Sequence, residues 1–339
     1  MKNRRGLLTA ILAAACLLLL GPAALSASVL KIASLSPDGS FWMEKMREGA
    51  RKVEEKTAGR VTFRFYPGGV MGDDKAVLRK IRAGQLAGGA VMAGSLAKVY
   101  SDSKVYNLPF CFRSLEEVDF VRSRMDPELL KGFEANGFVV FGIMEGGFAY
   151  VLSQEPLRNL EDLKRQKMWV PDYDDTAVYI VKSFGVTPIP LPLADVLTGL
   201  QTGLINTTVS SPIGAVALQW HTQVRYLIEA PVMYLYAVLA VDRKDFEKLS
   251  PEDQKIVREE MGKVCRIIDK QNRADNVAAT GALKKQGISF ISPQGTDLDA
   301  WYRQAEAVVA DMVKRGMISA SIVERLNRDL AEFRAGRKK

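Results

Sequence analysis

The sequence predicts an α/β protein with two lobes and one long helix that spans both of them. Two observations lead to this fold class. Residues 157–212 alternate between strand-like and helix-like segments, and residues 251 to about 285 form an uninterrupted run of helix formers. Such alternation is typical of βαβ units, in which helical crossovers connect parallel strands. At 339 residues the chain is long enough for two lobes with sizeable cores.

Two loops in the alternating segment follow predicted strands directly. One strand ends at Pro171 and leads into residues 172–175, and the last strand leads into residues 210–212. Open α/β sheets bind ligands outside the carboxyl ends of their strands. We therefore expect both loops to face a ligand.

The long helix has a clear predicted start. Ser250 is a favoured N-cap residue, Pro251 suits the first helical position, and Asp253 places an acid at the third. At 1.5 Å per residue, the run to about Lys285 is on the order of 50 Å long. A helix of that length exceeds one small lobe, so we expect it to span both.

Apolar patterning gives the order of the other elements. Gly146 and Gly147 predict a flexible step between two strands where the lobes join. Residues 232–241 are apolar on both faces, as expected of a covered strand by which the chain returns to the first lobe. Further strands are predicted at 29–35, 61–66, 89–93, 138–144, 148–153, 224–229 and 287–291, and further helices end at Ala58 and Gly84 or span 115–124, 127–136, 213–220, 297–315 and 320–333.

The N-terminus predicts an export signal. Three basic residues precede the uncharged run 6–20, and small residues follow at 23–28. These are the three regions of a secretory signal peptide, which we place at residues 1–28. A retained anchor is disfavoured because the apolar run falls short of the roughly 20 residues that span a bilayer. Lipid attachment at Cys16 is a second alternative, disfavoured because residues 17–20 prolong the apolar region past it.

The predicted lobes are discontinuous in sequence. Lobe I comprises residues 29–147 and 237–275, and lobe II comprises 148–236 and 276–339. An export signal, two α/β lobes crossed repeatedly by the chain, and ligand loops between them indicate a two-lobe binding protein of the venus-flytrap type found in the periplasm. Clefts between lobes are favoured ligand sites, and hinge closure traps the ligand.

Charge and composition exclude several function classes. Removing residues 1–28 lowers the formal net charge from +8 to +5, and the remaining basic residues are scattered beside acids. This pattern predicts solvated helix faces and no nucleic-acid partner. His221 is the only histidine, and no P-loop, CxxC or GxGxxG is present, so we expect no enzyme, cofactor or metal site. We interpret the acids at 172, 174 and 175 as helix-capping residues rather than metal ligands.

Aromatic, sulfur-bearing and polar residues at the predicted loops form the candidate ligand site. Any one of them alone is more often a core residue, but together they indicate a largely apolar pocket with a few polar groups. Ser210, Ser211 and Gln219 are candidates for those polar groups. The full candidate set is Phe41, Trp42, Met92, Glu145, Phe148, Trp169, Tyr173, Ser210, Ser211, Gln219 and Trp220.

Six segments in series resemble the solute-binding subunits of tripartite ATP-independent periplasmic (TRAP) transporters, the DctP-like family. Each is weak alone, but their order is specific. The resemblance implies a receptor that delivers a small-molecule ligand to membrane permease subunits driven by an ion gradient. The segments are ASLSPDGSFW at 33–42, 54–74, LPFCF at 108–112, LKRQKMWVP at 163–171, 184–205 and SPEDQKIV at 250–257.

The chain departs from this family where typical members grip a carboxylate. The resemblance implies an arginine in a K-x-R-V-P segment, and Trp169 stands in its place. A second cation of some members falls at Ala149, and the usual Asp-Gly-Gln-Glu-Asn-Pro stretch reads NTTVSSP at 206–212. Tryptophan supplies one N–H donor and no charge, so a small, highly charged acid is disfavoured.

We therefore expect a hydrophobic ligand or an amphipathic weak acid rather than a C4-dicarboxylate. Two alternatives remain open. One is an ordinary organic-acid binder that uses another cation, such as Lys167, which alternates onto the same strand face as Trp169, or Arg225. The other is a carrier of a lipid-like ligand that acts with a further envelope protein.

Overall fold

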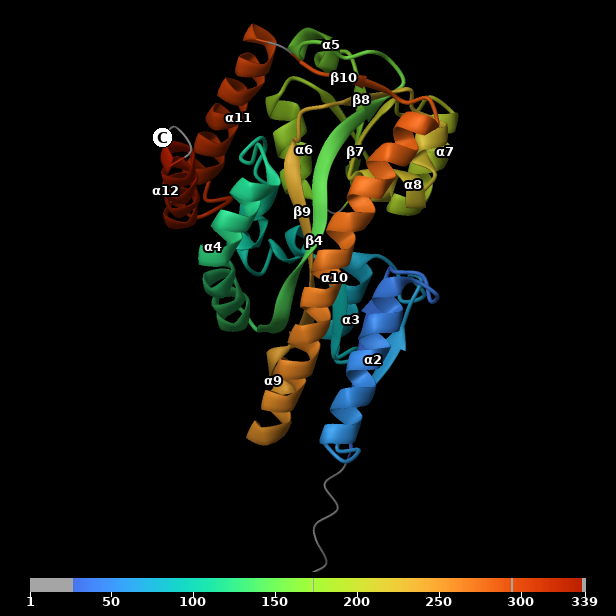
Figure 1. The fold of residues 1–339 in the computed structure, drawn as a ribbon, viewed down its shortest axis with the longest axis vertical. Helices are drawn as coiled ribbons and strands as arrows, with labels where there is room; N and C mark the ends of the chain where they lie inside the picture. The colour runs from blue at the N-terminus through green and yellow to red at the C-terminus, as the bar shows by residue number, and fades with distance from the viewer. Residues whose placement is uncertain (1–26, 173, 294, 337–339) are drawn as a thin grey trace, which may run out of the picture.

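The structure is a computed structural model that describes residues 27–172, 174–293 and 295–336. Apart from residues 27 and 28, the predicted signal peptide, with Cys16, lies outside the described residues. Figure 1 shows the molecule as two stacked lobes, with α10 (Pro251–Lys285) running from one to the other. The predicted fold class is confirmed.

The strands are short in both lobes except for two long ones that connect them. The described strands are β1 (Ser28–Ser34), β2 (Val61–Tyr66), β3 (Gly88–Met92), β4 (Phe138–Ser153), β5 (Lys167–Pro171), β6 (Thr187–Leu191), β7 (Thr207–Ser210), β8 (Tyr226–Ile228), β9 (Met233–Asp242) and β10 (Ser289–Ile291).

Helices cover the strands and form the connections between them. The described helices are α2 (Phe41–Lys56), α3 (Asp74–Arg82), α4 (Leu115–Ala135), α5 (Leu160–Lys164), α6 (Asp175–Ser183), α7 (Val196–Gln201), α8 (Pro212–Ala217), α9 (Arg243–Phe246), α10, α11 (Thr296–Lys314) and α12 (Ala320–Gly336), with 3₁₀ turns η1 (Ala93–Leu96), η2 (Ser101–Asn107), η3 (Leu193–Asp195) and η4 (Trp220–Thr222).

Strands β4 and β9 tie the two lobes into one sheet system. The order along the sheet is β2-β1-β3-β9-β4-β7-β5-β6, and β8, which pairs with β10, joins at β4. Strand β9 therefore lies between β3 of lobe I and β4, although it comes about 140 residues after β3 in the chain. Both lobes depend on the same pair of central strands.

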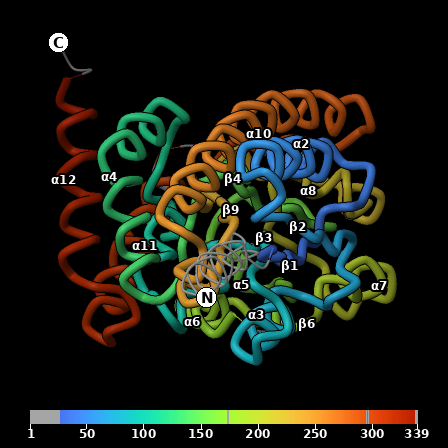
Figure 2. Tube along the Cα trace, turned by 90° about the horizontal axis from the view of Figure 1, so that it is seen from below, coloured from blue at the N-terminus to red at the C-terminus, as the bar shows by residue number. Residues whose placement is uncertain are grey.

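The long helix α10 begins as the sequence predicts. The Ser250 hydroxyl accepts a hydrogen bond from the Asp253 amide at 3.1 Å, and Pro251 occupies the first turn. Along its length α10 packs on α2, β4 and α8, and Figure 2 shows it beside α2. The expectation of one helix spanning both lobes is confirmed.

Two predicted breaks are wrong. The helices expected at 115–124 and 127–136 are the single helix α4, with Pro127 inside it. Buried Val121, Met125, Leu129 and Phe133 recur every four residues, so one apolar face continues across the proline and offsets its missing hydrogen bond.

The strands expected at 138–144 and 148–153 are likewise the single strand β4. Strand β9 pairs with β4 on both sides of the glycines, from Met144 opposite Ala237 to Phe148 opposite Tyr234. The register shifts between Glu145 and Gly147, and Gly147 has φ of +88°. The glycines therefore form an irregularity within one strand.

The described core contains one hydrophobic cluster that extends through both lobes and one further cluster in each lobe. In lobe I, α2 and α10 cover one sheet face. Helix α12, which the sequence analysis assigns to lobe II, packs on α4, which it assigns to lobe I. The sequence boundaries between the lobes stay predictions.

Candidate functional site

The parallel strands of the two lobes point their carboxyl ends toward each other. Strand β9 runs antiparallel to β3 and β4, and β4 runs antiparallel to β7. Strands β1 and β3 therefore run toward lobe II, and β5 and β7 run toward lobe I. We call the residues at these ends (34–42, 92–107, 171–172, 174–176 and 210–214) the strand-end region.

The register gives the spacing of the opposed ends. Met92 at the end of β3 and Met144 of β4 both pair with Ala237, whereas Ser210 at the end of β7 pairs with Tyr150. Met144 and Tyr150 lie six residues apart on β4, which corresponds to about 20 Å. Ligands of α/β proteins bind at the carboxyl ends of strands, so we expect the ligand between these two sets of strand ends.

Phe41 and Trp42 begin α2 on the lobe I side. The Ser40 side chain caps the helix by accepting a hydrogen bond from the Met43 amide. Both aromatic rings are partly buried against the lobe I core. The Trp42 indole N–H donates to Asn272 Oδ1 of α10 at 2.8 Å. Trp42 therefore links α2 to the long helix.

Met92 lies beside a buried acid. The Met92 amide donates to Asp74 Oδ2 at 3.0 Å, and the Ser95 hydroxyl donates to the same oxygen at 2.7 Å. Asp74 is 1% exposed. Burial raises the pKa of Asp74 to about 6, although the two hydrogen bonds act to lower it.

Trp169 and Trp220 come together in the core of lobe II. Their rings meet edge to face with centroids 5.1 Å apart, and Trp169 is 8% exposed. The Trp169 indole N–H donates to the Leu191 carbonyl at 3.0 Å. The one polar group of Trp169 is therefore satisfied within the protein, and the aromatic pair packs with Leu200 and Ile205.

Ser210 and Ser211 stand at the junction of β7 and α8. The Ser210 hydroxyl donates to the Ser211 carbonyl at 3.1 Å, and the Ser211 side chain caps α8 by accepting from the Gly214 amide. Gln219 is exposed and adopts a left-handed conformation with φ of +58°. Both serines are buried. Their hydroxyl groups therefore form hydrogen bonds within the protein.

The two cations suggested by the sequence lie away from the strand-end region. Lys167 is the first residue of β5, about 13 Å from the end of that strand at Pro171. Its exposed ammonium is 3.4 Å from the Gly203 carbonyl. The Arg225 amide donates to the carbonyl of Ser153, the last residue of β4. Both residues therefore sit at the outer end of lobe II.

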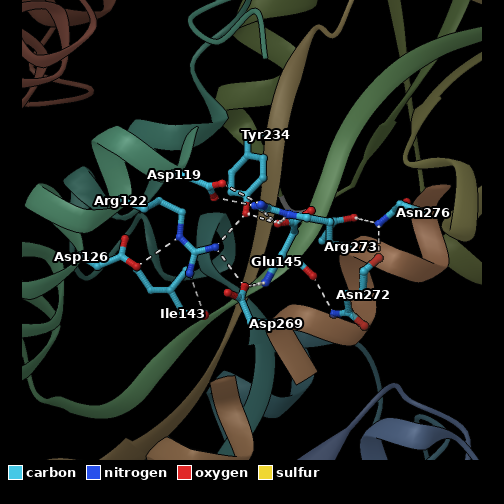
Figure 3. A network of polar contacts seen from close by, with 11 residues as sticks. Asp119, Arg122, Asp126, Ile143, Glu145, Tyr234, Asp269, Asn272, Arg273 and Asn276 are labelled. Atoms are coloured by element: carbon cyan, nitrogen blue, oxygen red, sulfur yellow. Dashed lines mark hydrogen bonds and ion pairs between the residues drawn. The ribbon is translucent and has the colours of Figure 1, made fainter. Parts of the chain in front are cut away.

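Glu145 is buried and belongs to a polar network at the joint between the lobes, which we call the hinge network (Figure 3). Its carboxylate accepts from Arg273 at 2.6 Å and 2.9 Å and from the Tyr234 hydroxyl at 3.1 Å. Phe148 packs edge to face on Tyr234 with centroids 5.8 Å apart. Arg273 also pairs with Asp119 at 2.8 Å.

Arg122 holds the other half of the hinge network. Its guanidinium donates to Asp126 at 3.1 Å, to Asp269 at 2.9 Å and to the Ile143 carbonyl at 3.0 Å. It also donates to the Tyr234 hydroxyl at 2.9 Å. Burial raises the pKa of Asp126 even though Arg122 acts to lower it.

Two asparagines of α10 connect the hinge strand to both lobes. Asn272 accepts from Trp42 and donates to the Glu145 carbonyl at 2.6 Å. Asn276, one turn later, donates to the Gly146 carbonyl at 3.2 Å and accepts from the Ile213 amide at 3.3 Å. The sequence analysis missed both residues, although an asparagine pair spaced four apart on one helix was a usable signal.

The sequence analysis also missed Lys104 of η2. It is buried, and its ammonium donates to the Thr176 hydroxyl of α6 at 2.8 Å. The contact joins the two lobes within the strand-end region. A lysine directly before the uncharged segment 105–112 was the available signal.

Several expectations concern residues or groups outside this geometry. Tyr173 lies outside the described residues. Within 27–172, 174–293 and 295–336, no cluster of His, Cys, Asp and Glu is suited to a metal ion. The same residues contain no helix with the length and apolar character of a membrane span. A surface groove between residues 108–113, α11 and α12 is separate from the strand-end region.

The comparisons with known proteins identify the class to which this fold and this site belong. The model of "Bacterial extracellular solute-binding protein, family 7" matches residues 32–315, and the chain belongs to this family. The resemblance to TRAP solute-binding subunits is confirmed. The chain is a solute-binding receptor and not an enzyme; TRAP receptors are periplasmic and work with membrane permease subunits.

Individual relatives are distant. The chain is 24% identical over 250 residues to the 2,3-diketo-L-gulonate-binding periplasmic protein YiaO of Escherichia coli, covering 73% of this chain and 74% of that protein. It is 27% identical over 213 residues to the uncharacterized protein YiiZ of Salmonella typhimurium, covering 61% of this chain and 64% of that protein. The match thus spans less than two thirds of YiiZ.

A solved structure shares the fold over nearly its whole length. It is a TRAP periplasmic solute-binding protein from Xanthobacter autotrophicus with bound β-D-galacturonate. The TM-score is 0.80 at 20% identity, with 89% of this chain and 99% of that chain covered. At this identity the likeness establishes the fold alone, and the ligand has to be inferred from the residues of the present chain.

Proposed function

We propose that this chain is the receptor of a TRAP transporter for a small organic acid, which it encloses between its lobes and delivers to the permease. The observation that carries the proposal is the pair of opposed strand ends joined by β4, β9 and α10. Opposed ends of this kind place ligand loops from both lobes around one space, so that hinge closure acts on the ligand from two sides.

The ligand is an acid with one carboxylate and a sizeable uncharged part, rather than a C4-dicarboxylate. A dicarboxylate needs two compensating groups, because a buried carboxylate without one costs several kcal/mol. Trp169 supplies no cation, and Lys167 and Arg225 lie at the outer end of lobe II. YiaO and the Xanthobacter protein are named for ligands that each carry one carboxylate.

The receptor acts in the periplasm after removal of residues 1–28. Support comes from the basic, apolar and small-residue regions of that segment and from the periplasmic location of TRAP receptors. Peptide mass fingerprinting of the exported protein tests the cleavage, with a mature N-terminus near Ser28 as the expected result. A mature chain that begins at a lipid-modified Cys16 would contradict it.

A binding screen tests the ligand class. Thermal-shift and calorimetric titrations compare hexuronates and aldonates with succinate, malate and fumarate. We expect micromolar binding of at least one monocarboxylate and none of the dicarboxylates. Lys167→Met is the matched control, and it should leave every affinity unchanged. Tight dicarboxylate binding that survives in Lys167→Met would sink the assignment to monocarboxylates.

The lipid-carrier alternative has weaker support. Among the described residues, the predicted aromatic ligand wall is largely committed to packing, with Trp169 and Trp220 in the lobe II core and Phe148 against Tyr234. No contact of the described residues favours a further envelope protein, and we do not propose one.

A further inference from the structure

A buried lysine lies where the two lobes meet. Lys104 belongs to η2, on the stretch of chain that leaves the carboxyl end of β3, and it is 7% exposed. Its ammonium reaches Thr176 in the first turn of α6, which follows the carboxyl end of β5. Lys104 therefore connects the strand ends of lobe I with those of lobe II.

The carboxylates near Lys104 are engaged by other donors. Asp174 caps α6 by accepting from the Thr176 and Ala177 amides, both at 3.0 Å. Asp102 accepts from the Ser319 amide at 2.8 Å and from the Ser319 hydroxyl at 2.7 Å. No described carboxylate lies within ion-pair distance of the Lys104 ammonium. Its described direct partner is a neutral hydroxyl.

Burial makes this arrangement unusual for a lysine. An ammonium carries three N–H donors, and Thr176 accepts one of them. Burial lowers the pKa of Lys104, while Asp174 and Asp102 act at longer range to raise it. Lys98, on the same connection, makes the ordinary contact, an exposed ion pair with Asp175 at 3.0 Å. A buried cation with so little direct compensation favours the approach of an anion.

We propose that Lys104 is the cation that binds the carboxylate of the solute. This inference rests on the proposed function, because it requires an organic acid as ligand. The ammonium donates to the carboxylate while Thr176 and the capped start of α6 hold it in place. The acid thereby contacts groups from both lobes at once, so that binding of the carboxylate and closure of the lobes favour each other.

The alternative role for Lys104 is a contact between the lobes without a ligand. Thr176→Val separates the two roles, because it removes the hydroxyl acceptor and keeps the shape of the side chain. If Lys104 binds the carboxylate, Thr176→Val leaves acid affinity within about threefold of wild type. If Lys104 acts through the contact between the lobes, Thr176→Val weakens binding as much as removal of the lysine.

The test is calorimetric titration of the full chain with the acids that bind in the screen, D-galacturonate among the probes. Lys104→Met replaces the ammonium with an apolar group of similar length, and we expect acid binding about 10- to 100-fold weaker. Lys104→Arg keeps the charge and should retain more affinity than Lys104→Met. Lys167→Met is the control for loss of an exposed lysine. Circular dichroism and thermal melting verify that each variant is folded.

The outcomes separate this inference from the function on which it rests. Wild-type affinity in folded Lys104→Met overturns the role of Lys104 and leaves the organic-acid receptor intact. Equal losses in Thr176→Val and Lys104→Met overturn it in favour of the contact between the lobes. Failure of the wild type to bind any acid in the screen overturns the proposed function and this inference with it. Should Lys104→Met not fold, the second neutral variant Lys104→Gln decides: acid binding at least about 10-fold weaker than in wild type supports the proposal, and wild-type affinity overturns it.

Discussion

The hinge network and the strand-end region contain buried charges in different states of pairing. In the hinge network Arg122 contacts two carboxylates, a hydroxyl and a carbonyl, and Arg273 pairs with two carboxylates. In the strand-end region Lys104 contacts one hydroxyl. Charges that the chain itself compensates fix the geometry of a joint, whereas a charge with little direct compensation is available to a solute.

The largest expected effect comes from opening the hinge network. Arg122→Met removes the cation that compensates Asp269 and Asp126, and uncompensated buried charges are costly. We expect the free energy of unfolding to fall by about 3–5 kcal/mol, measured by urea denaturation. Arg258→Met is the control, because Arg258 and Glu134 form a half-exposed pair at 2.6 Å. Arg258→Met should lower the free energy of unfolding by less than about 1 kcal/mol. Equal losses in both variants would show that the buried and the half-exposed charges contribute alike to stability.

The pH dependence of stability extends the comparison to Asp74, a buried acid that accepts hydrogen bonds from Met92 and Ser95 of the strand-end region. Burial raises the pKa of Asp74 from 3.8 to about 6, so the folded state binds its proton more tightly than the unfolded state. This stabilisation is present below about pH 4 and is lost as the pH rises through about 6. Between pH 4 and pH 7 we expect wild type to lose about 2 kcal/mol more than Asp74→Asn does.

Urea denaturation of both proteins at several pH values measures this difference. Asparagine retains an oxygen that accepts from Met92 and Ser95, so the hydrogen bonds survive in the variant. Parallel pH profiles for the two proteins would show that the Asp74 carboxyl does not titrate differently in the folded and unfolded states.

Substitution of Trp169 tests whether it belongs to the lobe II core or to the ligand site. Trp169→Phe removes the donor to the Leu191 carbonyl and reduces the area of contact with the Trp220 ring. We expect the free energy of unfolding to fall by about 1–2 kcal/mol and ligand affinity to stay near wild type, measured by urea denaturation and calorimetry. Loss of binding at unchanged stability would place Trp169 in the ligand site instead.

The smallest effect is expected at Lys98. Its pair with Asp175 joins side chains that are 70% and 78% exposed. Lys98→Met should change the free energy of unfolding by less than about 1 kcal/mol and leave acid affinity unchanged. A loss of affinity comparable to that of Lys104→Met would extend the ligand-binding charge to the exposed lysine as well.

Elements with a local signal were predictable from the sequence. The start and length of α10 follow from Ser250, Pro251 and the helix formers after them, and the strand ends near Pro171 and Ser210 follow from alternation. Pro127 and the glycines at 146 and 147 were interpreted as breaks because local preferences favour them there. Packing along α4 and pairing with β9 override those preferences.

The polar contacts between distant parts of the chain could not be predicted from the sequence, for a different reason. Glu145 and Arg273 are 128 residues apart, and Lys104 and Thr176 are 72 apart. Patterns of period 2 or 3.6 carry no information about such pairs. Trp169 was recognised as a departure from the family, but the acceptor that satisfies its N–H is a backbone carbonyl 22 residues away.

The position of β9 between β3 and β4 has a consequence for how the chain folds. Until residues 233–242 are available, β3 and β4 each have an unpaired edge and the central sheet exists as two separate halves. Unpaired edges are templates for association with other chains. Joining the halves closes a loop of more than a hundred residues, a step that slows folding. A chain that ends before β9 therefore exposes two unpaired strand edges that can associate with other chains. Export benefits if the chain stays unfolded until its synthesis is complete.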